Sequence, residues 1–293
     1  MRISLPLVVA AGMVVGGCEQ SSSVNVVAAQ AIPLPPPSCD GYPRTSANAV
    51  TICEERSYGP LPATGNAGIR SDGGVVQARG GFRTDLMLDA FVYATAPTEE
   101  AAREVAAQVV VHTENNDFHA TGPANTGSVS TGCAFEVGGS CVADGSSAGT
   151  TWTVSFVALL PFRTDLTAST ISGLVEITSI DGTSSFSSTS GALVLTGLAG
   201  EVMIDSTSGA VDVDLTGSSW RGAGMTVDTN SGAVVFHAPA DYSARFEFSS
   251  DSGSIHSDFS GTTTSGSYSE TLGNGGATLG AESNSGSIHL RRK

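Results

Sequence analysis

Positive charge is scarce in this chain of 293 residues. The chain carries 13 Lys and Arg against 28 Asp and Glu, for a formal net charge of −15, and its one lysine is Lys293. Binding to nucleic acid or to anionic lipid depends on clustered Lys and Arg. The only basic run is Arg291-Arg292-Lys293. The composition therefore argues against a nucleic-acid partner and against a general attraction to anionic membranes.

Aromatic and charged side chains are also few, at 6% and 14% of the residues, whereas glycine is abundant at 36 residues. This composition fits a β repeat of small residues better than a helical enzyme. A hydrophobic content of 40% is enough for a core, so global disorder is not expected. The length allows one large or two modest domains.

A repeat of nine residues organises the chain between residues 172 and 216. Its units read SGLVEITSI, DGTSSFSST, SGALVLTGL, AGEVMIDST and SGAVDVDLT. Each unit carries glycine at its second position and an apolar residue at its sixth, and the fourth is apolar in all units but the second. Apolar residues two apart, bounded by Gly and Ser, indicate a short half-buried strand and a turn. A fixed period of this kind is typical of a solenoid.

Two kinds of turn alternate, so the full period is eighteen residues. We therefore predict an all-β fold: a β-solenoid, or β-helix, with about 18 residues and two strands per coil, facing each other across a thin apolar core. The alternation places Val202, Ile204 and Val211 inside, and Met203 and Asp212 outside. Coil ends follow from the Ser-Gly pairs at Gly173, Gly191, Gly209, Gly232, Gly253 and Gly286. Glycine at these corners is expected to supply the positive φ angle that other residues avoid.

Residues 1–17 have the character of an export signal. Arg2 precedes an apolar run that is too short to span a bilayer as a mature helix. Val15-Gly16-Gly17-Cys18 resembles the bacterial lipobox, in which the cysteine is acylated and becomes the new N-terminus. An ordinary signal peptide before a chance cysteine is the alternative. The resemblance implies a lipid anchor at Cys18, and Glu19 after it favours the outer membrane.

Residues 18–53 comprise this anchor and a tether rich in Pro and Ser, which is expected to be semi-extended. The cysteines beyond Cys18 are Cys39, Cys53, Cys133 and Cys141. An even number in an exported chain indicates disulfides. Three connectivities are allowed, of which sequence proximity favours Cys39–Cys53 with Cys133–Cys141. A zinc site is the rival, but no close Cys-x-x-Cys or His pair accompanies these cysteines.

Residues 54–165 form a β-rich part before the repeat solenoid, which spans residues 166–293. Runs at 74–76, 86–93 and 109–111 indicate strands, and 151–160 alternates as a strand that Pro161 ends. One helix is expected before the strand at 109–111. Thr98 is a suitable N-cap, and Glu99 and Glu100 suit the positive end of the helix dipole. This helix is expected to cover or pack beside the first coils, because the ends of a solenoid need covering.

Three of these features together resemble the bacterial adhesin-like domain family that is built of repeated β-strands and has mostly unassigned function. They are the strand–helix–strand unit around Glu99, the lead-in from Leu160-Pro161 to Asp165-Leu166, and the Ser-Gly repeats. The resemblance covers about residues 54–292. It implies a β-solenoid, a location in the cell envelope and no established catalysis, and it supplies no catalytic residue. The four cysteines and three insertions between the late coils depart from the family pattern.

Candidate catalytic and metal-binding groups are few, and each has a plainer explanation. The run at residues 145–149 matches the G-x-S-x-G string of serine hydrolases, but it lacks the preceding strand and the following helix. We interpret it as a loop. His256 and His289 occupy equivalent outward positions in the repeat. Because a long insertion separates their coils, a shared metal ion is not expected.

Two alternative functions stay open. The nonamer resembles the calcium-binding β-roll, which also has eighteen residues per turn but needs GGxGxD loops. Asp205, Asp212 and Asp214 fall on outward strand positions, where solvation is the ordinary explanation. A β-helix enzyme acting on polysaccharide would need Asp together with Lys or Arg in one groove, and basic residues are scarce.

The three insertions predict where a ligand would bind. The gaps between successive Ser-Gly glycines are 18, 18, 23, 21 and 33 residues, and the excess lies after the odd strand. The insertions should therefore lie along one edge of the late coils. They carry Trp220, Arg221, His237, Asp241, Tyr242, Phe259 and Tyr268. One interpretation is a site for sugar rings or a protein partner; the other is a cover over the C-terminal end.

From these features of the sequence we predict a non-catalytic, lipid-anchored protein of the cell envelope that acts as an adhesin or scaffold. Its expected partners are the membrane, through the N-terminal lipid, and a glycan or surface protein. Neither a cofactor nor a metal is expected.

Overall fold

The repeat folds, as predicted, into a β-solenoid whose strands form two sheets of eleven strands each. The computed structural model describes residues 35–46, 48–126, 149–264 and 266–293. The first sheet has the spatial order β1 (Arg44–Thr45), β2 (Val50–Pro62), β5 (Asp85–Ala96), β8 (Thr151–Pro161), β4 (Val76–Gly81), β10 (Val175–Thr178), β12 (Leu193–Thr196), β14 (Val211–Asp214), β16 (Val234–Ala238), β22 (Ile288–Arg292) and β18 (Ile255–Ser257). The second sheet has the order β19 (Thr262–Thr264), β20 (Ser267–Leu272), β17 (Ala244–Ser250), β21 (Thr278–Ser283), β15 (Gly224–Thr229), β13 (Ala199–Ser206), β11 (Asp181–Ser188), β9 (Asp165–Thr170), β3 (Asn66–Ser71), β7 (Asp117–Thr121) and β6 (Val110–His112).

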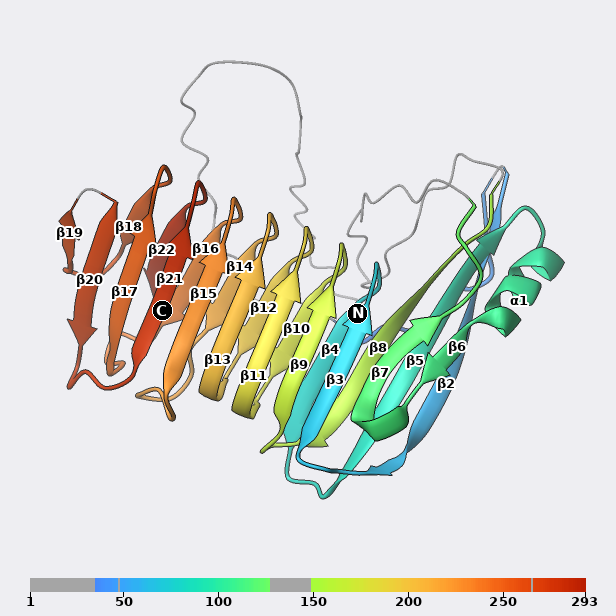
Figure 1. Cartoon of the computed structure of the whole chain (residues 1–293), viewed down its shortest axis with the longest axis horizontal. Helices are drawn as coiled ribbons and strands as arrows, with labels where there is room; N and C mark the ends of the chain where they lie inside the picture. The colour runs from blue at the N-terminus through green and yellow to red at the C-terminus, as the bar shows by residue number, and fades with distance from the viewer. Residues whose placement is uncertain (1–34, 47, 127–148, 265) are drawn as a thin grey trace, which may run out of the picture. The chain divides into compact units, whose positions relative to one another are not determined.

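Each coil contributes one strand to each sheet, and neighbouring coils pair in parallel (Figure 1). β11 and β13, for example, pair in unbroken register from Asp181 opposite Ala199 to Ser188 opposite Ser206. Side chains alternate across the strand, so Ile204 is 1% exposed whereas Met203 is 50% exposed. The predicted inward and outward register is confirmed, and the apolar columns form one continuous core between the sheets.

The Ser-Gly glycines have a different role from the predicted one. A positive φ angle occurs at Gly200, in the opposite kind of turn, but at none of the six Ser-Gly glycines. Each of these glycines instead lies against the backbone of the neighbouring coil. A Cβ atom on Gly191 would lie 1.7 Å from the carbonyl oxygen of Gly173, and one on Gly209 would lie equally close to that of Gly191. The coils approach so closely at this corner that only a hydrogen atom fits.

A buried hydroxyl group supports each of these corners from three residues upstream. Thr170 Oγ1 accepts a hydrogen bond from the backbone N–H of Gly173 at 2.9 Å. Ser206 Oγ instead donates to the carbonyl oxygen of Gly209 at 3.0 Å. Equivalent hydroxyls belong to Ser71, Ser188, Thr229, Ser250 and Ser283. Because buried backbone groups need partners, these hydroxyls explain why Ser or Thr stands three residues before each corner glycine.

The stack begins one coil before the sequence repeat. β3 and β4 form a coil whose corner glycine, Gly74, lies against Gly173, and β4 pairs in parallel with β10. The chain then leaves the stack and returns at β9. The solenoid therefore already starts at Asn66, inside the part that the sequence assigned to the N-terminal region.

The residues between β4 and β9 form β5, α1 (Glu99–Gln108), β6, the short 3-10 helix η1 (Glu114–Asn116), β7 and β8. The predicted helix and its N-cap are confirmed, since Thr98 Oγ1 accepts from the Ala101 N–H at 3.2 Å. α1 packs on β2 and β5. Arg56 of β2 holds the C-terminal end of α1 by donating to the carbonyl oxygens of Ala106 and Val109, at 2.8 and 2.6 Å.

The last coils do not stack in chain order (Figure 1). β21 lies between β15 and β17, and β22 lies between β16 and β18. The longest insertion causes this exchange, because it folds into β19 and β20, which pair antiparallel at the outer edge of the second sheet. The chain then turns back and fills the position between two coils that are already formed.

Candidate functional site

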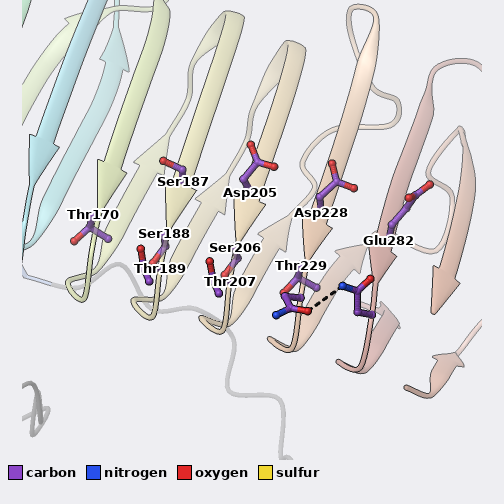
Figure 2. A pocket seen from close by; sticks show the side chains of 12 residues that line it. Thr170, Ser187, Ser188, Thr189, Asp205, Ser206, Thr207, Asp228, Thr229 and Glu282 are labelled. Carbon is purple, nitrogen blue, oxygen red and sulfur yellow. Dashed lines mark hydrogen bonds between the residues drawn. The ribbon is translucent and has the colours of Figure 1, made fainter. Parts of the chain in front are cut away.

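A polar hollow of about 470 Å³ lies on the outer face of the second sheet, beside the Ser-Gly corners (Figure 2). We call it the carboxylate trough. Strands β9, β11, β13, β15 and β21 and their following turns supply its walls, which are Thr170, Ser187, Ser188, Thr189, Asp205, Ser206, Thr207, Asp228, Thr229, Asn230, Glu282 and Asn284. No basic side chain occurs among these lining residues.

The parallel register brings three acids side by side in the trough. Asp205 is opposite Asp228, and Asp228 is opposite Glu282. Neighbouring strands are about 4.8 Å apart, so the carboxylates form a row with the spacing of the coils. Figure 2 shows the three side chains projecting from adjacent strands on the same face. Ser187 of β11 continues the row on one side.

The crowding of carboxylates changes the pKa of the central one. Loss of hydration among the neighbouring side chains raises the pKa of Asp228, and repulsion from Glu282 and Asp205 raises it further. The side chain is nevertheless exposed at the surface. A cation placed over the row would relieve this repulsion.

The floor of the trough is already occupied by structural hydrogen bonds. Ser188, Ser206, Thr170 and Thr229 hold the corners described above. Asn284 Nδ2 donates to Asn230 Oδ1 at 2.9 Å, drawn as the dashed line in Figure 2. The groups left to meet a ligand are therefore the three carboxylates and the exposed hydroxyls of the rim.

Only Asp205 of this row was singled out in the sequence, although its period contains the other two. Asp205, Asp228 and Glu282 each stand four residues before a Ser-Gly glycine. Reading the repeat for its outward positions, rather than only for its apolar ones, would have identified the row.

The predicted ligand edge is not an exposed aromatic surface, which corrects that interpretation. Trp220 is 7% exposed, and its ring N–H donates to the carbonyl oxygen of Gly200 at 3.1 Å. Tyr242 is 1% exposed, and this burial raises the pKa of its hydroxyl to about 12. Both rings fill the corner below the inserted loops, where backbone contacts join Ser219 to Ser243. They are not available to stack on a sugar.

Phe259 and Tyr268 belong to the cover over the C-terminal coils. Tyr268 is buried, stacks on Phe248 at 5.6 Å between ring centroids, and shares a hydrogen bond of 2.8 Å with Ser257. Phe259 is half-buried, and the Arg292 guanidinium lies over its ring at 4.6 Å. The second interpretation of these residues, a structural cover, agrees with their burial.

The polar members of the predicted edge do not meet at one place. Arg221 is exposed and contacts Asp181 at 3.8 Å and the ring of Phe162 at 5.5 Å. His237 lies on the outer face of the first sheet, with its Nε2 atom 3.4 Å from Asp212 Oδ2. Asp241 is exposed in the inserted loop before β17.

The exchange of the last coils makes His256 and His289 neighbours, contrary to the separation expected from their spacing. They pair in register between β18 and β22, with ring centroids 6.0 Å apart. Burial, Arg291 and His256 lower the pKa of His289. Within the described ranges, no group of three His, Cys, Asp or Glu residues is arranged to hold a metal ion.

The other outward acids have local partners. Asp214 forms an ion pair with Lys293, whose ammonium also donates to the carbonyl oxygen of Leu215 at 2.7 Å. Asp212 lies beside His237. Asp205 is the one of the three predicted outward acids that joins the trough.

Cys39 and Cys53 form a disulfide, with their Cα atoms 5.3 Å apart. This is one of the two pairs that proximity favoured. Cys18, Cys133 and Cys141 lie outside the described residues, as do residues 145–148 of the G-x-S-x-G string.

The two-sheet stack and its repeat are those of a known family. Residues 106–291 match the family model described as Toastrack DUF4097. The chain belongs to the Toastrack DUF4097 family. The adhesin-like resemblance of the repeats is thereby confirmed.

Two solved structures match this Toastrack chain at low identity. A candidate cell adhesion protein of Clostridium sporogenes has 10% identity and a TM-score of 0.41, covering 82% of this chain and 100% of its own. A candidate adhesin of Bacteroides fragilis has 12% identity and a TM-score of 0.36, covering 82% of this chain and 97% of its own. No curated protein matches the chain. Within the described residues, no helix has the length and apolar character needed to cross a membrane.

Proposed function

We propose that this Toastrack chain is a non-catalytic adhesin of the bacterial cell envelope, held at the outer membrane by a lipid on Cys18, and that the carboxylate trough is its binding surface. The observation that carries the proposal is the row formed by Asp205, Asp228 and Glu282. It occupies the same position on three adjacent strands and faces away from the core, and each of these strands pairs with a neighbour on both edges. The lipobox-like sequence before Cys18 supports the anchor.

The chemistry of the trough favours a ligand with amino groups. Three neighbouring carboxylates attract ammonium groups, and a row of fixed spacing suits a polymer that presents such groups repeatedly. The rim hydroxyls of Thr189, Thr207 and Ser187 can bond the hydroxyls of a sugar polymer. A polymer of amino sugars meets both conditions.

Binding of chitosan oligomers tests this proposal, with fully N-acetylated oligomers of the same length as the ligand control. The double variant Asp228→Asn with Glu282→Gln should weaken chitosan binding at least about tenfold, which corresponds to about 1.4 kcal/mol. The matched variant Glu104→Gln with Glu201→Gln removes the same charge outside the trough and should bind like the parent chain. Equal binding by both doubles, or no preference for the amine form, would refute the trough as the site.

The same mixtures separate adhesion from catalysis. The raised pKa of Asp228, next to two further carboxylates, is the one observation that favours a polysaccharide-cleaving enzyme, because such enzymes need a protonated and an ionised acid together. An adhesin leaves the oligomers intact. If the parent chain shortens the oligomers and the Asp228→Asn variant does not, our proposal is wrong and the protein is a polysaccharide-cleaving enzyme.

The anchor has its own test in cells. Cys18→Ala, or treatment with the lipoprotein signal-peptidase inhibitor globomycin, should mislocalise the protein from the outer-membrane fraction. Unchanged fractionation and no incorporation of labelled palmitate would refute the lipid.

A further inference from the structure

Exposed apolar side chains gather at the corner of the molecule opposite the Ser-Gly turns. Phe82, Met87 and Leu159 are 107%, 39% and 38% exposed, and they account for three of the six exposed large hydrophobic side chains in the described chain. On the surface of a soluble protein, a cluster of exposed apolar side chains usually marks an interaction site. We call this group, with Phe162, Arg79 and Arg163, the corner patch.

The register of the first sheet explains how the patch is assembled. Met87 is opposite Leu159 on the neighbouring strand, and Leu159 is opposite Arg79. The three side chains thus form one row on the outer face of the sheet. Three residues beyond Leu159, Phe162 stacks on Phe82 with ring centroids 6.4 Å apart, and its N–H donates to the carbonyl oxygen of Gly81 at 2.8 Å.

Arginine accompanies the apolar groups here, in a chain that has few cations. Arg79 and Arg163 are exposed. Arg83 and Arg221 lie beside them but are paired with Asp85 and Asp181, at 2.9 and 3.8 Å. Asp89, Asp165 and Glu176 are the further nearby acids, on β5, β9 and β10. Positive and negative groups are therefore nearly balanced at this corner, whereas the whole chain has a net charge of −15.

The tether reaches the folded part of the chain at this same place. The described chain begins at Pro35, and Pro36 lines a hollow of about 200 Å³ together with Arg79, Leu159 and Glu176. The Cys39–Cys53 disulfide fixes the following residues to β2. Sixteen residues lie between Cys18 and Pro35, so a lipid on Cys18 allows the corner to lie on the membrane or up to about 60 Å from it.

The geometry points to the corner patch as a membrane-docking surface: Phe82 enters the interfacial region of the bilayer, with Met87 and Leu159 against it, while Arg79 and Arg163 contact lipid phosphates. This inference rests on the proposed lipid anchor. Aromatic rings and long cationic side chains are the groups that favour the interface, and Arg near an anionic surface is attracted to its phosphates. Docking there holds the solenoid in one orientation, which a flexible tether alone cannot do.

Quenching by brominated lipid tests the docking. The full lipidated protein is reconstituted in vesicles of phosphatidylethanolamine and phosphatidylglycerol, with and without bromine on the upper acyl chain. Tryptophan is introduced by Phe82→Trp, and Met203→Trp, at an exposed position on the second sheet, is the matched control. Bromine should reduce the emission added by Phe82→Trp at least about twofold and leave that of Met203→Trp unchanged.

Each outcome decides a different claim. Protein that floats with the vesicles but shows no quenching of Phe82→Trp refutes the docking surface and leaves the anchor intact. Protein that does not float refutes the lipid anchor, and the docking inference with it. Quenching that is equal at both positions also overturns the inference, because it means that the molecule has no fixed face toward the bilayer. A concentration-dependent blue shift without quenching would assign the patch to a second copy of the chain.

Discussion

At the scale of single residues, close approach of backbones decides the composition of the corners. The Ser-Gly glycines do not need an unusual φ angle; they need the absence of a Cβ atom, because the carbonyl oxygen of the preceding coil occupies its place. The hydroxyl three residues earlier satisfies a backbone group that the turn would otherwise leave buried and unpaired. Small residues are therefore a packing requirement of this fold.

Gly191→Ala should destabilise the protein by about 3 kcal/mol, the upper range for overpacking, because the coils must separate to admit the methyl group. Gly81→Ala is the matched control, since no atom lies within 4 Å of its Cβ position. Chemical denaturation monitored by circular dichroism gives both values. Equal midpoints would show that the coils can shift apart at little cost.

Ile204→Asp should destabilise the protein by about 4 kcal/mol or more, because it buries an unpaired charge in the core. Met203→Asp, one residue earlier and 50% exposed, should change stability by no more than about 0.5 kcal/mol. Thermal melting of the two variants compares them directly. A tolerated charge at position 204 would contradict the register.

Asp228 gives a prediction that depends on pH. Its pKa in the folded chain is raised, so its ionisation disfavours the folded state as the pH rises through that pKa, and the effect vanishes below the unfolded value of about 3.9. Asp228→Asn should therefore have a higher Tm than the parent chain at pH 7 and the same Tm at about pH 3. Identical melting at pH 7 would exclude repulsion within the row.

At the scale of elements, the ends of the solenoid are built from strands that break the repeat. At the N-terminal side, β2, β5 and β8 pair antiparallel and carry α1. At the C-terminal side, β19 and β20 extend the second sheet, and β21 then enters between β15 and β17. Aromatic rings, including Phe236, Phe248 and Tyr268, fill the core at that end.

The exchanged order of the strands can be tested by cross-linking. The pair Asp228→Cys with Glu282→Cys occupies neighbouring strands in register, about 4.8 Å apart, and should form a disulfide under mild oxidation. The pair Asp228→Cys with Ser249→Cys is separated by β21, at about twice that distance, and should not. Mass spectrometry of the digested protein distinguishes the pairs. The opposite result would mean that the coils stack in chain order.

At the scale of the whole molecule, one continuous core links coils that each contact only their neighbours. In such a stack, stability comes from the interfaces between coils, so the terminal coils are less stable than the central ones. The central coils of β11 to β14 have a partner on both sides, whereas β18 and β19 are short and each has one paired neighbour.

Hydrogen exchange should follow this gradient. Amides of β11 and β13 should exchange slowest, and those of β18 and β19 should exchange at least about a hundredfold faster, because opening an end strand breaks one interface instead of two. Exchange measured by mass spectrometry on overlapping peptides provides the comparison. Uniform protection from β11 to β19 would indicate a single cooperative unit without fraying ends.

The sequence by itself determined the coil. Its period of eighteen, the inward Val202 and Ile204, the outward Met203 and the capped helix at Thr98 follow from local alternation and from side-chain chemistry that acts over a few residues. The Toastrack repeat could be predicted from the sequence for the same reason, since every coil repeats the same local contacts.

Only the tertiary structure decided how coils and insertions meet. The exchange of β17 and β21 depends on β21 entering between β15 and β17 after the β19–β20 hairpin has paired with β17, and it alone places His256 beside His289 and Asp228 beside Glu282. The burial of Trp220 and Tyr242 depends on loops from different coils that pack over them. The corner patch depends on the pairing of β5, β8 and β4, which the chain connects through excursions that carry no periodic signal. Spacing along a chain fixes local geometry, whereas proximity between distant segments is set by which apolar and hydrogen-bonding surfaces remain to be covered.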